Sequence, residues 1–324
     1  MLSSVTTSVR ERVGTRWALV AAGVLVLGAI VLAVYPYGET DDPNELSAER
    51  TYELRGPWVR PDAGFSADPA LQARTSPLVV VTPGAAGASE ARVLVGARVR
   101  AAQRLSLAAG AGEAVLTRWR DDAVAVARTT PSPRAVAVAV ASLDSGRRLA
   151  DAVVPVPGRR GAAVDAQLGP WDGRPDDLFL VVWPRRDALR AGQRATGMQP
   201  QPRLEILRGD AGWRRRALIV GLPLVAQAPS DWTVLVARVS GVDADLVLVR
   251  HSAGRQPELH VLSGESGFRQ FLLHQRLDLP ASVARRAAYV PALEAGQPVL
   301  RVVDASVGRA TVRVFPLGAA PSTT

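Results

Sequence analysis

Three acids stand close together in the stretch WDGRPDDLFLVV, which covers residues 171–182. Asp172, Asp176 and Asp177 could bind calcium, an ion that takes about six to eight oxygen ligands. Two carboxylates about 5–10 Å apart across a cleft could instead act as the acid and base of glycoside hydrolysis. The third possibility is structural, because an Asp-Gly pair before an apolar strand is a turn signal and Asp orders such a turn by bonding nearby backbone groups.

A second acidic pair, Asp121 and Asp122, also precedes an apolar run. Adjacent acids at equivalent turns of different segments favour a structural role over a catalytic one. The stretch SGESG, residues 263–267, is similar to the nucleophile turn of serine hydrolases but lacks the second glycine at the required spacing. The aligned stretch RGDAG has Ala211 in the place of Ser266, so we interpret both stretches as turns.

The only histidines are His251, His260 and His274, and all three fall in one repeat unit. A zinc site would need them on one face of the protein. Leu259 and Val261 are expected to face inward, so the alternation of a strand points His260 outward. We therefore interpret the histidines as surface or hydrogen-bonded side chains. No cofactor is expected, and calcium is the one ion that remains a candidate.

Aromatic and acidic side chains beside the repeated turns could form a binding surface. Trp171 and Trp183 flank the acidic loop, and Asp243 and Asp245 stand in the related loop SGVDADL, residues 240–246. Tryptophan is enriched among the residues that dominate protein interfaces. Packing between repeats is the alternative for both tryptophans.

Two parts of the chain resemble each other, which indicates an internal repeat. Both contain Asp-Leu, an apolar strand, a loop, a second strand and a Gly-acid-small-Gly-aromatic turn. The matching segments are DDLFLVV (176–182) with RLEILRGDAGW (203–213), and ADLVLVR (244–250) with ELHVLSGESGF (258–268). Trp213 aligns with Phe268, so both are expected to pack between units. Weaker copies place the first apolar residues of five units at Leu78, Ala123, Leu178, Leu246 and Val299.

Each unit of about 50 residues holds about four strand-like runs that are rich in Val and Leu and bounded by Gly, Pro or Asp. Four antiparallel strands per repeat at this period are typical of a β-propeller blade. We therefore predict an all-β propeller of about five four-stranded blades over residues 55–318. A pair of β-sandwiches and a β-solenoid are the alternatives. The best helical candidate is PASVARRAAYVPALEAG, residues 280–296.

The run WALVAAGVLVLGAIVLAVY, residues 17–35, carries no charge. As a helix it would span about 28 Å, close to the roughly 30 Å hydrocarbon thickness of a bilayer. Arginines precede the run and acids follow it, so residues 1–16 are expected in the cytoplasm and the bulk of the chain outside. A cleaved signal peptide is the alternative, but its apolar core is usually about 7–15 residues. We predict a transmembrane signal anchor, a polar linker over residues 36–54 and a disordered C-terminus over residues 319–324.

The composition is strongly basic and contains no cysteine. All 39 basic residues are arginines, and the net charge is +9. Such a balance often indicates nucleic-acid binding, but the arginines are spread along the chain, so we expect no nucleic-acid partner. The lack of cysteine excludes disulfides, thiolate catalysis and cysteine-ligated metals.

The repeat motif resembles the FG-GAP/VCBS repeat family, the blades of integrin-alpha-type propellers. DGRPD, Asp172–Asp176, is similar to the second half of that family's calcium loop, and DLFLVV and ADLVLV are similar to its strand entry. The resemblance implies calcium in the loops and a propeller that binds proteins or glycans. This chain departs from the motif at Leu168 and Pro170, which replace two oxygen ligands. We interpret the loop as a degenerate metal loop that now serves as a turn.

Together these features predict a single-pass protein of the cell membrane with a propeller outside the cytoplasm. The expected function is non-catalytic binding or scaffolding of an envelope protein or a cell-wall glycan. The alternative is an extracytoplasmic glycan hydrolase or lyase that uses the central channel, which would require acids and Arg or His to converge there.

Overall fold

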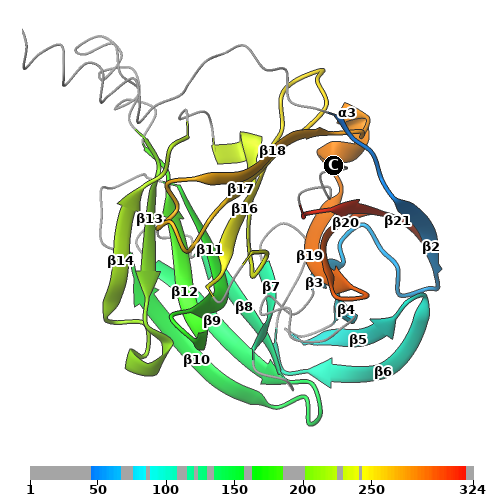
Figure 1. Ribbon diagram of the computed structural model, residues 1–324. Helices are drawn as coiled ribbons and strands as arrows, with labels where there is room; N and C mark the ends of the chain where they lie inside the picture. Colours follow the sequence, from blue (N-terminus) through cyan, green and yellow to red (C-terminus); the bar gives the residue numbers. More distant parts are fainter. Residues whose placement is uncertain are drawn as a thin grey trace, which may run out of the picture. The chain divides into compact units, whose positions relative to one another are not determined.

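The Val- and Leu-rich runs form strands, and the strands form five separate sheets (Figure 1). The computed structural model describes residues 45–66, 76–84, 88–107, 115–119, 123–129, 135–156, 163–184, 201–224, 229–240 and 243–318. The predicted membrane segment 17–35, the tail 1–16 and the C-terminal residues 319–324 lie outside these ranges. Within the described ranges, no helix has the length and hydropathy needed to cross a bilayer.

The first three sheets are meanders of four consecutive antiparallel strands. The first sheet comprises β3 (Gly64–Ser66), β4 (Leu78–Pro83), β5 (Ser89–Val95) and β6 (Arg98–Leu105). The second comprises β7 (Val115–Trp119), β8 (Ala123–Thr129), β9 (Ala135–Ser142) and β10 (Arg148–Pro155). The third comprises β11 (Val164–Trp171), β12 (Arg174–Val182), β13 (Arg203–Leu207) and β14 (Arg216–Gly221).

The last two sheets each take one strand from the start of the described chain. The fourth comprises β15 (Trp232–Ala237), β16 (Asp245–Arg250), β17 (Glu258–Leu262) and β18 (Phe271–Leu277), with β1 (Glu45–Leu46) added in parallel to β18. The fifth comprises β19 (Ala288–Glu294), β20 (Gln297–Ser306), β21 (Arg309–Pro316) and β2 (Arg50–Arg55). β2 runs antiparallel to β21, with Arg50 opposite Val314 and Arg55 opposite Arg309.

The five sheets are arranged as a β-propeller, in which each sheet is one blade. The first strand of each sheet contacts the first strand of the next, in the order β3, β7, β11, β15 and β19, and β19 contacts β3. These contacts close a ring of sheets. The prediction of an all-β propeller is therefore confirmed, and the sequence units begin at the second strand of each blade.

The core consists of five clusters of buried side chains, and each cluster lies between two neighbouring sheets. Alternation along a strand sends successive side chains to opposite faces. In β12, Leu178 and Leu180 pack toward the second sheet, whereas Phe179 and Val181 pack toward the fourth. Both faces of the sheet are thus apolar, which explains why the strands read as continuous Val and Leu runs rather than alternating ones.

The predicted linker boundary is wrong. The stretch 36–54 contains β1 and all of β2 but its last residue, and Leu54 is fully buried between the fifth and first sheets. The best helical candidate, 280–296, contains only the short helix α3 (Ala281–Ala284), followed by β19. Tertiary pairing of β19 with β20 overrides the helical preference of its alanines.

The other helical turns in the described residues are η2 (Gly209–Ala211) and η3 (Pro229–Asp231). η2 occupies the turn between β13 and β14, where the repeated Gly-acid-small-Gly-aromatic motif begins. In the fourth blade the same motif starts at Gly264, and a Cβ added there would lie 2.3 Å from the carbonyl oxygen of Ala244. Glycine is therefore required at this position because the turn packs directly on the neighbouring backbone.

We expect Gly264→Ala to lower the free energy of unfolding by roughly 1–3 kcal/mol, because the added methyl group must displace backbone. The measurement is denaturant unfolding of the full chain, followed by tryptophan fluorescence. Gly221→Ala is the matched control, since its Cβ would meet nothing nearer than Gln201 Oε1 at 3.5 Å. Equal unfolding midpoints for the two variants would contradict the packing described here.

Candidate functional site

Each of the two best-matched repeats contains an equivalent hydrogen bond from a turn N–H to a buried aspartate, and this bond explains their common motif. Asp177 Oδ1 accepts a hydrogen bond from the backbone N–H of Gly209 at 2.7 Å, and Asp245 Oδ1 accepts one from Gly264 N–H at 2.8 Å. Both carboxylates are fully buried. The acid at the start of the second strand therefore fixes the turn that follows the third strand in the same blade.

Asp245 is held by further donors from its own loop. Its Oδ2 accepts hydrogen bonds from the N–H groups of Val239 at 2.9 Å and Ser240 at 2.8 Å, and the Ser240 hydroxyl also donates to it. Asp177 forms an ion pair with Arg208 at 3.2 Å. The prediction of Asp245 on a binding surface is wrong because its carboxylate faces the interior. Asp177 is buried as well, and calcium binding by its carboxylate stays a prediction.

Asp172 occupies a tight hairpin turn rather than an ion-binding loop. Asp172 and Gly173 have φ values of 51° and 72°, the left-handed pair of a two-residue turn that joins β11 to β12. The Asp172 side chain is 67% exposed and pairs with Arg208 at 2.8 Å. One guanidinium thus contacts both Asp172 and Asp177, which places a positive charge where a shared calcium ion would need to be. The side chain of Asp176 lies outside the described part of the structure.

The turn is also linked to the next blade. Asp243 Oδ1 accepts a hydrogen bond from the Asp172 N–H at 2.6 Å. Trp171, partly buried, stacks on Phe268 with ring centroids 5.3 Å apart. Asp243 and Trp171 therefore join the third and fourth blades, and their contacts are made within the protein.

Trp183 belongs to the core. Its side chain is 1% exposed and stacks with Trp232 at a centroid distance of 6.2 Å. The prediction of Trp183 on a binding surface is wrong because the aromatic pair fills the space between the third and fourth blades. Trp213 and Phe268 are both buried between blades, as their alignment predicts.

The histidine prediction holds only in part. His251 contacts the hydroxyl of Thr233 at 2.8 Å, and burial lowers its pKa. His260 was expected to face outward, but it is 7% exposed because Trp232, Phe271 and His274 cover it. The face opposite Leu259 is therefore also packed, since a propeller blade has neighbours on both sides.

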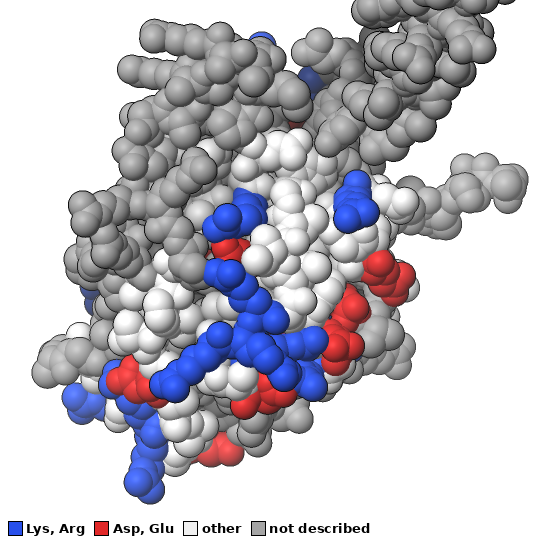
Figure 2. All heavy atoms as spheres, turned by 90° about the vertical axis from the view of Figure 1, so that its left-hand side faces the viewer, with Lys and Arg blue, Asp and Glu red and all other residues white. Residues whose placement is uncertain are grey.

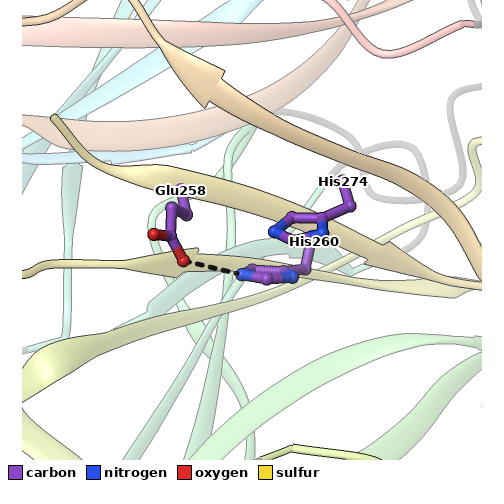
Figure 3. Close-up of side chains that lie close together, drawn as sticks. All are labelled: Glu258, His260 and His274. Atoms are coloured by element: carbon purple, nitrogen blue, oxygen red, sulfur yellow. Dashed lines mark ion pairs between the residues drawn. The ribbon is translucent and has the colours of Figure 1, made fainter. Parts of the chain in front are cut away.

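His260 lies in a cluster with His274 and Glu258 (Figure 3). The two imidazole rings stack with centroids 4.3 Å apart and planes 20° from parallel. The His260 imidazole lowers the pKa of Glu258 to about 2, burial opposes this shift, and Arg250 adds to it. Burial and the neighbouring His260 lower the pKa of His274. The cluster thus combines an ionised carboxylate with an imidazole that favours its neutral form.

The structure also reveals an open cleft between the first and second blades, which the sequence did not indicate. Its volume is about 470 Å³, and its lining includes the arginines Arg104 and Arg147 and the serines Ser106 and Ser145. Ser106 N–H donates to the Gly146 carbonyl at 2.9 Å, which holds the end of β6 against the turn after β9. Among the described residues, neither of the two arginines forms an ion pair with a carboxylate.

Arginines elsewhere on the surface are interspersed with acids. Figure 2 shows the face that carries the outer strands β10 and β14, where basic side chains form an irregular band with acidic ones beside it. Arg203 and Arg216 on this side both pair with Glu205, and Arg148 pairs with Asp151. Paired charges of this kind differ from the continuous basic stripe of nucleic-acid-binding proteins.

Comparison with known proteins adds little beyond the fold. No protein-family model and no curated protein matches the chain. AofleA from Arthrobotrys oligospora aligns with a TM-score of 0.44 and 12% identity over 86% of this chain and 93% of that chain. The Dos1 propeller aligns with a TM-score of 0.32 and 9% identity over 69% of this chain and 49% of that chain. Similarities this low carry no inference about ligands, and the resemblance to FG-GAP/VCBS repeats stays a prediction.

We expect Asp245→Ala to destabilise the protein by about 3 kcal/mol, because three N–H groups lose their acceptor, one in a buried hydrogen bond and two in part-buried ones. Asp243→Ala, which removes one acceptor at a partly exposed site, is expected to cost about 1 kcal/mol. Urea unfolding of both variants measures the difference. A loss for Asp245→Ala no larger than that for Asp243→Ala would show that the buried carboxylate is not a structural anchor.

A pH dependence is expected from Asp165. Burial raises the pKa of Asp165 to about 6, although the hydrogen bond from the Trp183 indole N–H acts in the opposite direction. The folded state therefore binds this proton more tightly than the unfolded state, so its contribution to stability grows as the pH falls from about 6 to 4 and is lost above 6.

Asp165→Asn tests this linkage, since the amide oxygen can still accept the indole hydrogen bond. We expect the variant to be more stable than the unchanged chain at pH 7.5, with the difference shrinking toward pH 4. Thermal unfolding across this range measures it. Asp151→Asn, an exposed acid on β10, removes the same charge as a control. A constant difference between the Asp165 variant and the unchanged chain would contradict the assignment.

Proposed function

We propose that this chain is a non-catalytic binding protein of the cell envelope, anchored by residues 17–35, whose propeller binds an anionic cell-wall glycan. The support for anchoring is the uncharged run with arginines before it and acids after it. A tether of this kind would hold the propeller at high local concentration near the membrane and its polymer layer. The glycan is the chosen partner because the cleft between the first and second blades is open, polar and positively charged.

The observation that carries the proposal is that Arg104 and Arg147 both line that cleft. Arg104 lies near the end of β6, and Arg147 lies in the turn between β9 and β10, so two blades each supply one guanidinium. Both arginines are exposed. Guanidinium groups bind carboxylate and phosphate oxygens with two parallel hydrogen bonds, and the hydroxyls of Ser106 and Ser145 could add further bonds to such a group.

In the two best-matched repeats, the loop acids whose side chains the structure describes are already engaged. Asp177 and Asp245 accept backbone hydrogen bonds in the interior, and Asp172 and Asp243 tie two blades together. These contacts favour binding over the glycan hydrolase or lyase alternative, which needs a free acid and base facing one cleft.

The test uses the full chain in detergent and three polymers. Polygalacturonate carries carboxylates, polyphosphate carries phosphates, and dextran is neutral. We expect the chain to bind at least one anionic polymer in affinity electrophoresis, to ignore dextran, and to bind less tightly as salt is raised. The double variant Arg104→Ala, Arg147→Ala is expected to bind at least about tenfold more weakly, since each charged hydrogen bond contributes about 1.5–3 kcal/mol.

Arg98→Ala with Arg100→Ala is the matched control. These arginines lie on the same strand β6, are exposed and do not line the cleft. The control removes the same charge, so we expect it to bind as the unchanged chain does. Equal losses of polymer affinity in the two double variants would show that only net charge matters, and would contradict a binding site in the cleft. Binding of dextran, or binding of no polymer, would overturn the proposal.

A further inference from the structure

Three potential metal ligands lie on one face of the fourth blade. His260 on β17 stands directly opposite His274 on β18, and Glu258 lies two residues before His260, so all three side chains share one side of the sheet (Figure 3). The hydrogen-bonded ladder of two adjacent strands therefore fixes their spacing. This cluster is separate from the cleft between the first and second blades, so its role does not depend on the function proposed above.

The donor atoms are close enough for one ion. One ligand atom from each residue can be chosen so that all three lie within 4.8 Å of one another. Ligand atoms about 2.0–2.2 Å from a tetrahedral zinc ion are about 3.3–3.5 Å apart. His260 Nε2 is already 3.7 Å from Glu258 Oε2. Because the two rings are stacked, binding requires the His274 ring to turn out of the stack so that one of its nitrogens points to the same centre.

The decisive feature is that His260 has no hydrogen-bond partner among the residues that the structure describes. Its side chain is buried, and neither ring nitrogen forms a hydrogen bond within the described residues. The 3.7 Å separation from Glu258 is too long for one. Buried polar groups are almost always satisfied, so an exception calls for an explanation such as a bound ion. The neighbouring imidazole cannot serve as the partner in a stacked arrangement, because stacked rings direct their nitrogens past each other.

Two arginines face the same group of ligands, and they set a limit on affinity. Arg250 pairs with Glu258 at 3.1 Å, and Arg276 stands opposite Glu258 on β18. Their positive charges repel a cation. A carboxylate has about four lone-pair sites, however, so Glu258 can accept from Arg250 and still bind a metal with another lone pair.

We propose that Glu258, His260 and His274 form a binding site for a divalent transition-metal ion of the zinc class. Two imidazoles and one carboxylate are the protein ligands of one well-known type of zinc site, in which water takes the fourth position. His274 is exposed, so the ion is reachable from solvent and can keep such a water. Calcium and magnesium are disfavoured because they select oxygen ligands.

The test is titration of the full chain, purified without a histidine tag, with zinc in a calorimeter and with cobalt in a spectrometer. The chain contains no cysteine and only three histidines, so the background of competing ligands is small. We expect one equivalent of zinc, and a visible cobalt spectrum of tetrahedral type. His274→Ala is expected to weaken zinc binding at least tenfold, and Glu258→Gln to weaken it as well.

His251→Ala is the matched control, since His251 bonds to Thr233 outside the cluster, and it should bind zinc as the unchanged chain does. His274 is exposed on the outer strand β18, so its variant is expected to fold, and circular dichroism checks this. Failure of the unchanged chain to take up zinc would overturn the proposal. So would equal binding by the folded His274→Ala variant, because the ion would then sit elsewhere.

Discussion

Every sheet of this propeller has two apolar faces, and both must be covered by another sheet. A stack of such sheets would leave its outermost faces in water, whereas a closed ring leaves none. The contact of β19 with β3 provides that closure, and the pairing of β2 with β21 completes the last sheet. Burial of apolar area is the dominant favourable term in folding, so the five inter-blade clusters exist as a set only while the ring is closed.

Closure also dictates where the polar groups go. Turns between strands must pack against neighbouring blades, and their backbone N–H groups are then removed from water. Asp177 and Asp245 supply acceptors for these groups, and the bonds to several N–H donors offset the cost of burying a charge. The acids of these loops, which in the sequence resemble ligands or catalytic groups, thus mainly accept hydrogen bonds that hold the blades together. Many of the arginines that face solvent pair with surface acids.

Much of the fold follows from the sequence because the repeat carries it. In the third and fourth blades the second and third strands are buried on both sides, so they give runs rich in Val and Leu that are easily recognised. The innermost strand β11 was missed because Gly169 and Pro170 interrupt its pattern, and Leu168 was assigned to a loop although it is buried. The strand persists because its pairing with β12 is specified by tertiary structure rather than by local preference.

The candidate sites were harder to predict for a different reason. The repeated Asp and Gly were visible, but a sequence does not say whether a carboxylate points outward to a ligand or inward to a backbone N–H. The sequence predicts that His260 faces outward only if one face of its strand is exposed to solvent. That condition holds in a two-layer fold but not in a blade that has neighbours on both sides. Arg104 and Arg147 could not be singled out from the sequence, because all 39 basic residues are arginines and these two do not differ from the others in their local pattern.

The strand that closes the ring has a consequence for how the protein is made. The ion pair between Glu53 and Arg309 joins positions 256 apart in the chain, and β2 can find β21 only when nearly the whole chain has been synthesised. Until then a nascent chain with four complete sheets still exposes the apolar faces of its two end sheets. Exposed apolar surface of this kind favours aggregation, and pairing between distant strands is slow. A chain that ends before residue 309 would therefore lack both β21 and a partner for β2, and its ring of sheets would stay open.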